Sequence, residues 1–571
     1  MKRRISTSDI WADFCAALTS YDGGMTVEQL LNDGWQFCKL PLGSTLEDVS
    51  NAALQAVDLP HDFLIENEND LYETTDAWYL RTLDVPESWC ASCVLVRFDG
   101  VYMDCDVLLN GHIVCTHHYG YTAFDVDLTS RLLVGRNTLA VHVRHQSPNS
   151  RWYSGAGIYR DVTLYVLPKR HIPLDGVYVT TTHELESWTM SIDTELCGVK
   201  DNGVLTHVLL DGDVPVCDVT VEAAGDHANA VMQVLSPKLW SPDAPNVYTL
   251  QTMLGNQVIR QNVGFRDLTF TTDCGLLVNG APVKLHGVCL HHDLGCLGSA
   301  FHEKAMRRQL RAMRQMGVNA LRTSHNPPAK QVMDLCDELG IFVVDEAFDM
   351  WLRAKTPFDY ARFFPTDMPS DVAAWVRRDR NHPSLLMWSI GNEILDTHLD
   401  ESAQQVTCDL CENVRLHDPR GNAIITIGSN FMPWEGARKC ADLVDAQGYN
   451  YGEKYYEAHH AEHPDWVIYG SETASALSSR GIYHFPMAAS ILSDEDLQCS
   501  ALGNSTSSWG TKDMRKCIVE DLNTPYSLGQ FLWSGIDYIG EPTPYHTRSC
   551  YFGMMDTAVF PKDYWYLFKS L

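Results

Sequence analysis

The sequence predicts a multidomain protein with an N-terminal jelly-roll-like β-sandwich, an immunoglobulin-like β-sandwich and a C-terminal (β/α)8 TIM barrel. The chain has 571 residues, which is too long for one ordinary hydrophobic core. Short β segments separated by turns fill the first half of the chain. In the second half, apolar β segments alternate with segments of helical periodicity. This change of pattern separates the two sandwiches from the barrel.

The first predicted sandwich spans residues 31–170 and follows an N-terminal extension, residues 1–30, that has no regular pattern. Residues 105–117 alternate apolar and polar side chains on either side of Asn110-Gly111, which is typical of a two-residue hairpin turn. Residues 137–145 and 160–167 alternate in the same way. Such a series of strands predicts a jelly-roll-like layout.

The second predicted sandwich spans residues 171–270. Five candidate strands occur in this stretch, and turn residues recur about every ten positions. This spacing and a length of about 100 residues are typical of an immunoglobulin-like sandwich.

The predicted barrel spans residues 271–571. It is expected from eight β segments, 283–291, 319–325, 341–348, 384–393, 423–428, 444–450, 466–472 and 528–537. Their number, and the helical patterns between them, fit a (β/α)8 barrel better than an open doubly wound sheet. No Gly-x-Gly-x-x-Gly run opens a helix after any of them, which disfavours a dinucleotide-binding domain.

Composition excludes several classes of partner. The chain holds 43 Lys and Arg against 73 Asp and Glu, a net charge of −30, which disfavours both nucleic acid and an anionic membrane surface. The sequence contains no run of 18 apolar residues, the length that a membrane-spanning helix needs. No apolar segment of a signal peptide follows the first four residues, and the 18 cysteines are scattered, as in a cytoplasmic enzyme. The sequence leaves the oligomeric state, including a homo-oligomer, open.

Polar and aromatic residues crowd the carboxyl ends of the predicted barrel strands, where the active sites of such barrels lie. They are His291, Arg322, His325, Asp345, Glu346, Asn392, Glu393, Tyr449, Asn450, Tyr451, Glu472 and Trp533. Glu393 and Glu472 end the fourth and seventh strands and should face each other. A pair of carboxyl groups is what glycoside cleavage needs, and Trp533 offers a flat floor for a sugar ring.

Two other patterns suggest metal or redox chemistry. His291 and His292 are neighbours on a predicted strand, so their side chains point to opposite faces and no metal site is expected. The pairs Cys90–Cys93 and Cys408–Cys411 lie about 315 positions apart without a βαβ setting, so we interpret them as incidental thiols.

Five sequence runs resemble the signature runs of glycoside hydrolase family two. They are Arg-Trp-Tyr-Ser-Gly-Ala-Gly-Ile-Tyr-Arg-Asp-Val at 151–162, Arg-Thr-Ser-His-Asn-Pro-Pro at 322–328, Trp-Ser-Ile-Gly-Asn-Glu at 388–393, Tyr-Gly-Ser-Glu at 469–472, and 532–545. The resemblance implies a retaining hydrolase with a sugar-binding type of first domain. It further implies that Glu393 is the acid/base and Glu472 the nucleophile.

The resemblance also assigns substrate contacts. It implies that Asn392 binds the sugar 2-hydroxyl, that Arg322 and His325 orient the substrate, that Tyr449 or Tyr451 lies beside the nucleophile, that His291 reaches the far hydroxyls, and that the Trp533–Ser534 peptide is cis. Asp345 and Glu346 are expected to be partners of Arg322. For Asp62 two roles stay open, a contact to the site from the first domain and an ordinary loop role.

The family divides by substrate, and the resemblance favours a β-galactosidase. Glucuronidase members carry an Asn-x-Lys pair after the eighth strand, and residues 546–565 contain no such pair. Metal-dependent galactosidases bind magnesium shortly after an Asp-Glu-Ala run, where this chain has Met350 and Leu352. No catalytic metal and no other cofactor is therefore expected, and the substrate is a small-molecule or oligosaccharide β-glycoside.

Three alternatives stay open. Arg353, Lys355 and Arg548 could hold an acidic sugar by another route, which would make the chain a β-galacturonidase or a β-glucuronidase. A carbohydrate-binding pseudoenzyme on the same scaffold is the alternative of another class. The presence of both Glu393 and Glu472 argues against it, because a protein without activity has no chemical need for either.

Overall fold

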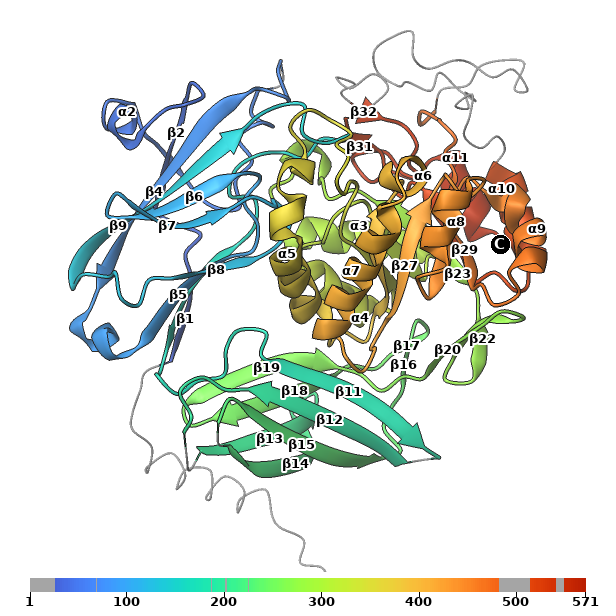
Figure 1. Ribbon diagram of the computed structural model, residues 1–571, viewed down its shortest axis with the longest axis horizontal. Helices are drawn as coiled ribbons and strands as arrows, with labels where there is room; N and C mark the ends of the chain where they lie inside the picture. The colour runs from blue at the N-terminus through green and yellow to red at the C-terminus, as the bar shows by residue number, and fades with distance from the viewer. Residues whose placement is uncertain are drawn as a thin grey trace, which may run out of the picture.

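A computed structural model describes residues 26–67, 69–185, 187–200, 203–223, 225–481, 514–540 and 549–571. It confirms the predicted fold class, with two β-sandwiches and a closed barrel. In Figure 1 the first sandwich (blue) lies beside the barrel (yellow to red), and the second sandwich (green) lies below both. Most of the predicted irregular extension falls outside the described residues. Its last part differs from the prediction, because Val27–Leu30 forms strand β1 by pairing with a distant strand.

The first sandwich consists of a four-stranded and a six-stranded sheet. The four-stranded sheet has the order β1, β10 (Val162–Leu167), β5 (Cys93–Phe98) and β8 (Phe124–Asp127). The six-stranded sheet has the order β3 (Gln55–Val57), β2 (Trp35–Leu40), β4 (Thr75–Val85), β9 (Gly135–His145), β6 (Cys105–Leu109) and β7 (His112–His117). Their inner faces bury one apolar core, which includes Phe98, Val107 and Val141.

The predicted hairpin turn joins β6 and β7. Asn110 and Gly111 have φ angles of +51° and +83°, the left-handed pair that a two-residue turn of this type requires. The strands leave the turn paired, with Leu109 opposite His112.

The second sandwich pairs a three-stranded with a four-stranded sheet. Their strands are β11 (Val177–Glu184), β12 (Ser187–Glu195) and β15 (His227–Leu235), and β14 (Val214–Ala223), β13 (Gly203–Asp211), β18 (Tyr248–Leu254) and β19 (Gln257–Val263). Buried and exposed residues alternate strictly along β15, as expected of a strand with one face on the core. That core includes Met190, Leu205 and Leu250.

The barrel closes through eight parallel strands, which match the eight predicted segments. They are β23 (Leu285–Leu290), β24 (Ala320–Thr323), β25 (Phe342–Glu346), β26 (Leu385–Asn392), β27 (Ile424–Ser429), β28 (Ala446–Asn450), β29 (Ile468–Ala474) and β30 (Gly529–Trp533). All residues of β25, β26, β28, β29 and β30 are buried, because helices cover the outer face and side chains fill the inside.

Helices alternate with the strands around the barrel (Figure 1). The α-helices of the described barrel residues are α3 (Glu303–Met316), α4 (Lys330–Leu339), α5 (Phe364–Asp379), α6 (Asp396–Leu399), α7 (Ala403–His417), α8 (Glu435–Ala441), α9 (Tyr456–Glu462), α10 (Met514–Leu522) and α11 (Asp563–Lys569). Shorter elements are α2 (Leu46–Ser50), the 3-10 turns η1 (Glu87–Ala91), η2 (Gly295–Leu297), η3 (Tyr360–Arg362) and η4 (Glu453–Tyr455), and strands β16 (Trp240–Ser241), β17 (Ala244–Pro245), β20 (Leu268–Thr271), β21 (Gly275–Val278), β22 (Ala281–Val283), β31 (Tyr538–Ile539) and β32 (Ser549–Cys550).

The two sandwiches contact different ends of the barrel. Gly340, which ends α4 with a φ of +68°, packs against the carbonyl of Pro242 so closely that no side chain would fit. This contact precedes β25, so the second sandwich lies at the amino-terminal face. Arg160 of the first sandwich donates to the carbonyl of Pro327 at 2.8 Å. Pro327 follows β24, so the first sandwich lies at the carboxyl-terminal face, where the candidate site is.

No helix among the described residues is both long and apolar enough to cross a bilayer. All cysteines in the described part of the chain are free thiols. Cys408 and Cys411 belong to helix α7, and Cys90 and Cys93 lie at the end of η1 and the start of β5.

Candidate active site

Glu393 and Glu472 lie at the carboxyl ends of β26 and β29, as predicted. Their exposed fractions are only 9% and 4%, so neither is a solvated rim group. Glu393 has a φ of +46°, a left-handed conformation that L residues rarely adopt. Its N–H donates to the carbonyl of Gly428 at 2.8 Å, and its Oε1 accepts from Asn450 Nδ2 at 3.1 Å. The turn therefore holds the carboxyl group at the barrel mouth, against the next two strands.

Arg322 joins the two carboxylate strands. Its Nη1 donates to Glu472 Oε1 at 2.9 Å and its Nη2 to Asn392 Oδ1 at 2.8 Å. Three further bonds of 2.8 to 3.0 Å bind the guanidinium to both oxygens of Glu346. Arg322 is fully buried, and a buried guanidinium is stable only when such a fork of acceptors surrounds it. Gly428 leaves the space, since a Cβ there would lie 3.0 Å from Nη2.

The surroundings of Glu472 control its protonation. Burial raises the pKa of Glu472 to about 7, although Arg322 acts in the opposite direction, and the nearby charge of Glu393 adds to the rise. A carboxyl group with a pKa near neutrality exists in both protonation states around pH 7. The site therefore holds two carboxyl groups, Glu393 and Glu472, that are close enough to influence each other.

Aromatic rings form one wall of the mouth. Trp533 is 7% exposed, its ring is stacked on His325 at 5.3 Å, and its Nε1 donates to the Tyr538 hydroxyl at 3.2 Å. The predicted cis peptide at Trp533–Ser534 is confirmed. His291 packs edge-on against Trp533 at 5.2 Å. Burial holds the pKa of both His291 and His325 well below the usual value, so both imidazoles are neutral.

His325 also connects the wall to the carboxylates. Its Nδ1 bonds Glu346 at 2.8 Å, and its Nε2 lies 3.7 Å from Glu472 Oε1. Two buried carboxyl groups, a guanidinium, neutral imidazoles and a flat indole thus meet at one end of the barrel. Such a set can transfer a proton, attack a carbon centre and hold a hydroxyl-rich ring.

Comparisons with known proteins show the family of the chain. Family models for the glycosyl hydrolases family 2 sugar-binding domain, for glycosyl hydrolases family 2 and for its TIM barrel domain match residues 25–168, 171–266 and 271–422. β-Galactosidase BoGH2A of Bacteroides ovatus is 35% identical, over 90% of this chain and 68% of the relative. The chain belongs to glycosyl hydrolase family 2. It is therefore a glycoside hydrolase.

Solved structures of the same family resemble the whole described architecture. A family 2 member from Bacteroides cellulosilyticus has a TM-score of 0.81 at 28% identity, over 95% of this chain and 70% of that one. The β-glucuronidase of Bacteroides uniformis has a TM-score of 0.80 at 25% identity, over 95% and 69%. A longer relative from Formosa agariphila is 29% identical over 95% of this chain, which spans 55% of its length.

Four further residues belong to the bonded network around Glu393, and the sequence predicts a catalytic role for none of them. Arg151, from the first sandwich, donates to Glu393 Oε2 at 3.3 Å and holds both oxygens of Asp349. Lys355 Nζ donates to Asp349 Oδ1 at 2.8 Å and to the Asn392 carbonyl at 3.0 Å. Burial acts to raise the pKa of Asp349, but Arg151 and Lys355 outweigh it and lower the pKa to about 2. The fourth is Asn450, which bonds both Asn392 and Glu393.

The sequence contains features that point to some of these four residues. Arg151 opens one of the five family runs, and Asn450 stands at a predicted strand end. The sequence suggests Lys355 only as a partner for an acidic sugar. Arg353, considered with it, donates instead to Asp400 at 3.1 Å and is exposed, and Arg548 lies outside the described residues.

The two tyrosines occupy different places. Tyr451 lies beside Glu472. Burial of the phenol raises its pKa well above the usual value, and the charge of Glu472 adds to the rise. Tyr449 is fully buried, and its hydroxyl bonds His459 Nδ1 at 2.9 Å in a cluster with Tyr456 and Trp466. Of the two tyrosines predicted as alternatives beside Glu472, the structure therefore places Tyr451 there and not Tyr449. Tyr451 follows the end of β28 with a φ of +55°, which breaks the strand alternation and turns it into the site.

Asp62 has a structural role at the domain interface. Its Oδ1 accepts from the backbone N–H of Leu64 and Ala156, both at 3.1 Å. Its Oδ2 accepts from the Tyr153 hydroxyl at 2.7 Å and from the N–H and hydroxyl of Ser299 at 2.8 and 3.0 Å. Five donors saturate both oxygens, so the carboxylate fixes the first sandwich to the barrel and is not a substrate contact.

The two acidic residues of β25, Asp345 and Glu346, have different surroundings. Glu346 is the bidentate partner of Arg322, as predicted. Asp345 is not, because adjacent strand residues point to opposite faces, and its surroundings are Trp375, Arg378 and Asp379 on α5. Burial, with the charge of Asp379, holds the pKa of Asp345 well above its usual value.

The positions considered for metal ligands have other surroundings. Met350 is buried in the main barrel core, Leu352 is 43% exposed, and His292 Nε2 bonds the carbonyl of Ser154 at 3.0 Å. Within the described ranges, one close group of ligand-type side chains is found, Asp334, Asp337 and His382. Asp334 and Asp337 lie on α4, and His382 lies just before β26, so the group is at the opposite end of the strand from the mouth, and His382 is paired with Asp337 at 2.6 Å.

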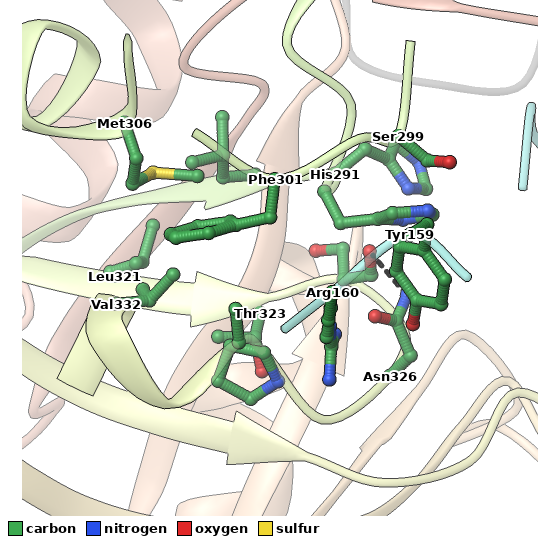
Figure 2. Close-up of a pocket in the computed structure, with 15 residues that line it drawn as sticks. Tyr159, Arg160, His291, Ser299, Phe301, Met306, Leu321, Thr323, Asn326 and Val332 are labelled. Carbon is green, nitrogen blue, oxygen red and sulfur yellow. Dashed lines mark hydrogen bonds between the residues drawn. The ribbon is translucent and has the colours of Figure 1, made fainter. Parts of the chain in front are cut away.

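A small cavity lies beside the site, between the first sandwich and the barrel. Figure 2 shows Phe301, Met306 and Val332 on one side of it and Tyr159 and Arg160 on the other. Its volume of about 30 Å³ admits a water molecule but not a sugar ring. His291 also lines this cavity. The cavity itself is therefore too small to be the place where a glycoside binds.

Proposed function

We propose that this chain is a retaining exo-β-glycoside hydrolase that acts on β-galactosides. The observation that carries the proposal is the convergence of two buried carboxyl groups, Glu393 and Glu472, on one bonded network through Arg322, Asn392 and Asn450. Retaining cleavage needs such a pair with the carboxyl groups about 5–5.5 Å apart, because no water has to fit between them and the sugar in the first step.

The proposed reaction has two displacements. In the first, the carboxylate of Glu472 attacks the anomeric carbon, the bond to the leaving oxygen breaks, and Glu393 gives its proton to that oxygen. In the second, Glu393 takes a proton from water, the water oxygen attacks the anomeric carbon, and Glu472 is released as a carboxylate. Arg322 favours the ionised Glu472 that this cycle requires.

Asn392 is proposed to bind the sugar 2-hydroxyl. Its Oδ1 accepts from both Arg322 and Asn450, so this oxygen is occupied. Its Nδ2 is the donor that can reach a substrate, and this Nδ2 donates to Asp349 at 2.8 Å. A hydroxyl at this position would accept from Nδ2, and Asp349 would accept from the hydroxyl. His325 and His291 are proposed to contact further hydroxyls, with Trp533 as the floor.

Galactose is favoured over an acidic sugar by the pairing of the site cations. Arg151 and Lys355 both bind Asp349, so a sugar carboxylate would have to compete with a buried ion pair for either of them. The similarity to β-galactosidase BoGH2A supports the same choice. The similarity to a β-glucuronidase structure favours β-glucuronides as the second candidate.

A panel of p-nitrophenyl glycosides tests the proposal. We expect the β-galactoside to be hydrolysed with the highest kcat/KM, ahead of the β-glucuronide and the β-galacturonide, because no unpaired cation awaits a carboxylate among the described site residues. Proton NMR of the first-formed sugar should show the β anomer. A preference for either uronide would contradict the proposed substrate, and an α anomer would contradict the retaining mechanism. If no glycoside were turned over, the chain would be a carbohydrate-binding protein without activity.

The dependence of the rate on pH should follow the ionisation of the Glu472 carboxyl group. Only the ionised carboxylate can attack, so kcat/KM for an activated aryl glycoside should fall about tenfold for each pH unit below about 7. In Glu393→Gln the neighbouring negative charge is lost, which lowers the pKa of Glu472, and the acidic limb should move to lower pH. A limb that stays in place in Glu393→Gln would show that another group controls it.

A further inference from the structure

A group of three aromatic rings, exposed at Trp434 and half-buried at His398 and Phe431, lies outside the network described above. Trp434 is 59% exposed. The ring of His398 is stacked on Phe431 at 3.8 Å and lies 5.8 Å from the ring of Trp434. We call these three residues the aromatic platform. Leu399, next to His398 in the chain, is 58% exposed, so apolar side chains face solvent here, and such surfaces commonly bind a ligand.

The loops that carry the platform are fixed to each other. Gly436, at the start of α8, lies so close to α6 that a Cβ would be 2.6 Å from the carbonyl oxygen of Thr397. Helices α6 and α8 lie side by side in Figure 1. Arg353 donates to Asp400 at 3.1 Å, and its N–H to Asp396 at 3.3 Å. Trp434 and His398 are therefore presented by packed backbone, not by a loose loop.

The platform lies on the side of the acid/base. Phe431 and Trp434 follow β27, and His398 follows β26 only five residues after Glu393. The two strand ends are joined where Glu393 N–H donates to the Gly428 carbonyl. Glu393 must protonate the oxygen of the leaving group, and Glu472 must attack from the opposite side of the sugar. The leaving group therefore extends toward the strand ends that carry Glu393, not toward Glu472.

We propose that the aromatic platform is the binding site for the leaving group, and that its ligand is a second sugar ring. The apolar C–H face of a pyranose stacks on an indole as an aromatic ring does. This inference rests on the proposed function and deepens it, because it assigns specificity for a glycosyl leaving group to Trp434. Trp434 contacts the substrate in this arrangement but takes no part in proton transfer.

The test compares two substrates that share a poor alkyl leaving group and differ in the ring. The leaving group of lactose is a sugar, and that of methyl β-galactoside is methanol, which has no ring. We expect Trp434→Ala to lower kcat/KM for lactose about tenfold, which corresponds to about 1.4 kcal/mol of stacking, and to change kcat/KM for methyl β-galactoside less than twofold. Trp434→Phe should keep most of the activity on lactose.

Tyr566→Ala is the matched control, because Tyr566 is an aromatic residue of similar exposure, 60%, on α11. It should leave both substrates unchanged. An unchanged lactose rate in Trp434→Ala, or equal losses on both substrates with a lower melting temperature, would overturn the platform while leaving the proposed function in place. If the wild-type chain hydrolyses neither galactoside, the proposed function fails, and the platform proposal falls with it.

Discussion

Glu472→Gln is expected to lower kcat by a factor on the order of 10⁴ or more on every glycoside that the enzyme accepts. The amide has almost the same shape as the carboxylate but cannot attack the anomeric carbon, and the neighbouring Glu346 cannot replace it, because Glu346 is fully buried and bound by Arg322 and His325. Initial rates with an aryl β-galactoside measure the loss directly. Mass spectrometry of the wild type with a slow substrate should also find a glycosyl adduct on the peptide that contains Glu472.

The fold should survive this change. Arg322 loses one charged partner but keeps both oxygens of Glu346 and the oxygen of Asn392. Glu462→Gln makes the same chemical change at an exposed position of α9 and should keep full activity. A Glu472→Gln protein with a normal melting temperature and a rate within tenfold of wild type would remove Glu472 as the nucleophile.

Glu393→Ala is expected to produce losses that depend on the leaving group. General acid catalysis contributes about 10²- to 10⁴-fold, and it is needed most when the leaving oxygen is strongly basic. The loss should approach that range for lactose and stay small for the first step with a dinitrophenyl galactoside, which leaves without a proton. Without a base, the glycosyl enzyme should accumulate, so that a burst of dinitrophenol precedes slow turnover.

Added azide should restore turnover of Glu393→Ala, because a small anion can enter the space left by the side chain and attack without a base. The product should then be β-galactosyl azide, identified by NMR. Glu393→Gln fills that space and serves as the control, with little rescue expected. Equal losses on lactose and on the dinitrophenyl substrate, without an azide product, would assign the acid/base role to another residue.

The first sandwich takes part in this chemistry through Arg151. Its guanidinium binds Asp349 and reaches Glu393, so the position of the Glu393 carboxyl group depends on how the sandwich sits on the barrel. Asp62, with five donors from both domains, helps to fix that position. The sugar-binding type of domain thereby contributes a side chain to the candidate site of the barrel.

The sequence by itself determined the domain types, the eight barrel strands and both carboxyl groups. These features depend on local information. Apolar runs that alternate with helical periodicity predict barrel strands, Asn110-Gly111 predicts a turn because both residues accept a positive φ, and residues such as Glu393 stand directly at strand ends. A residue that directly follows a barrel strand lies at the carboxyl-terminal face of the barrel, so its position in the sequence predicts its position in the fold.

Only the tertiary structure decided which neighbour at a strand end enters the site. Asp345 and Glu346 are equivalent in the sequence, and the rotation of the strand places Glu346 on Arg322 and Asp345 on α5. Tyr449 and Tyr451 should share a face by alternation, but the left-handed backbone of Tyr451 separates them. Arg151 reaches Glu393 across 242 positions of the chain. Contacts of this kind depend on the packing of whole domains, which no local pattern of residues encodes.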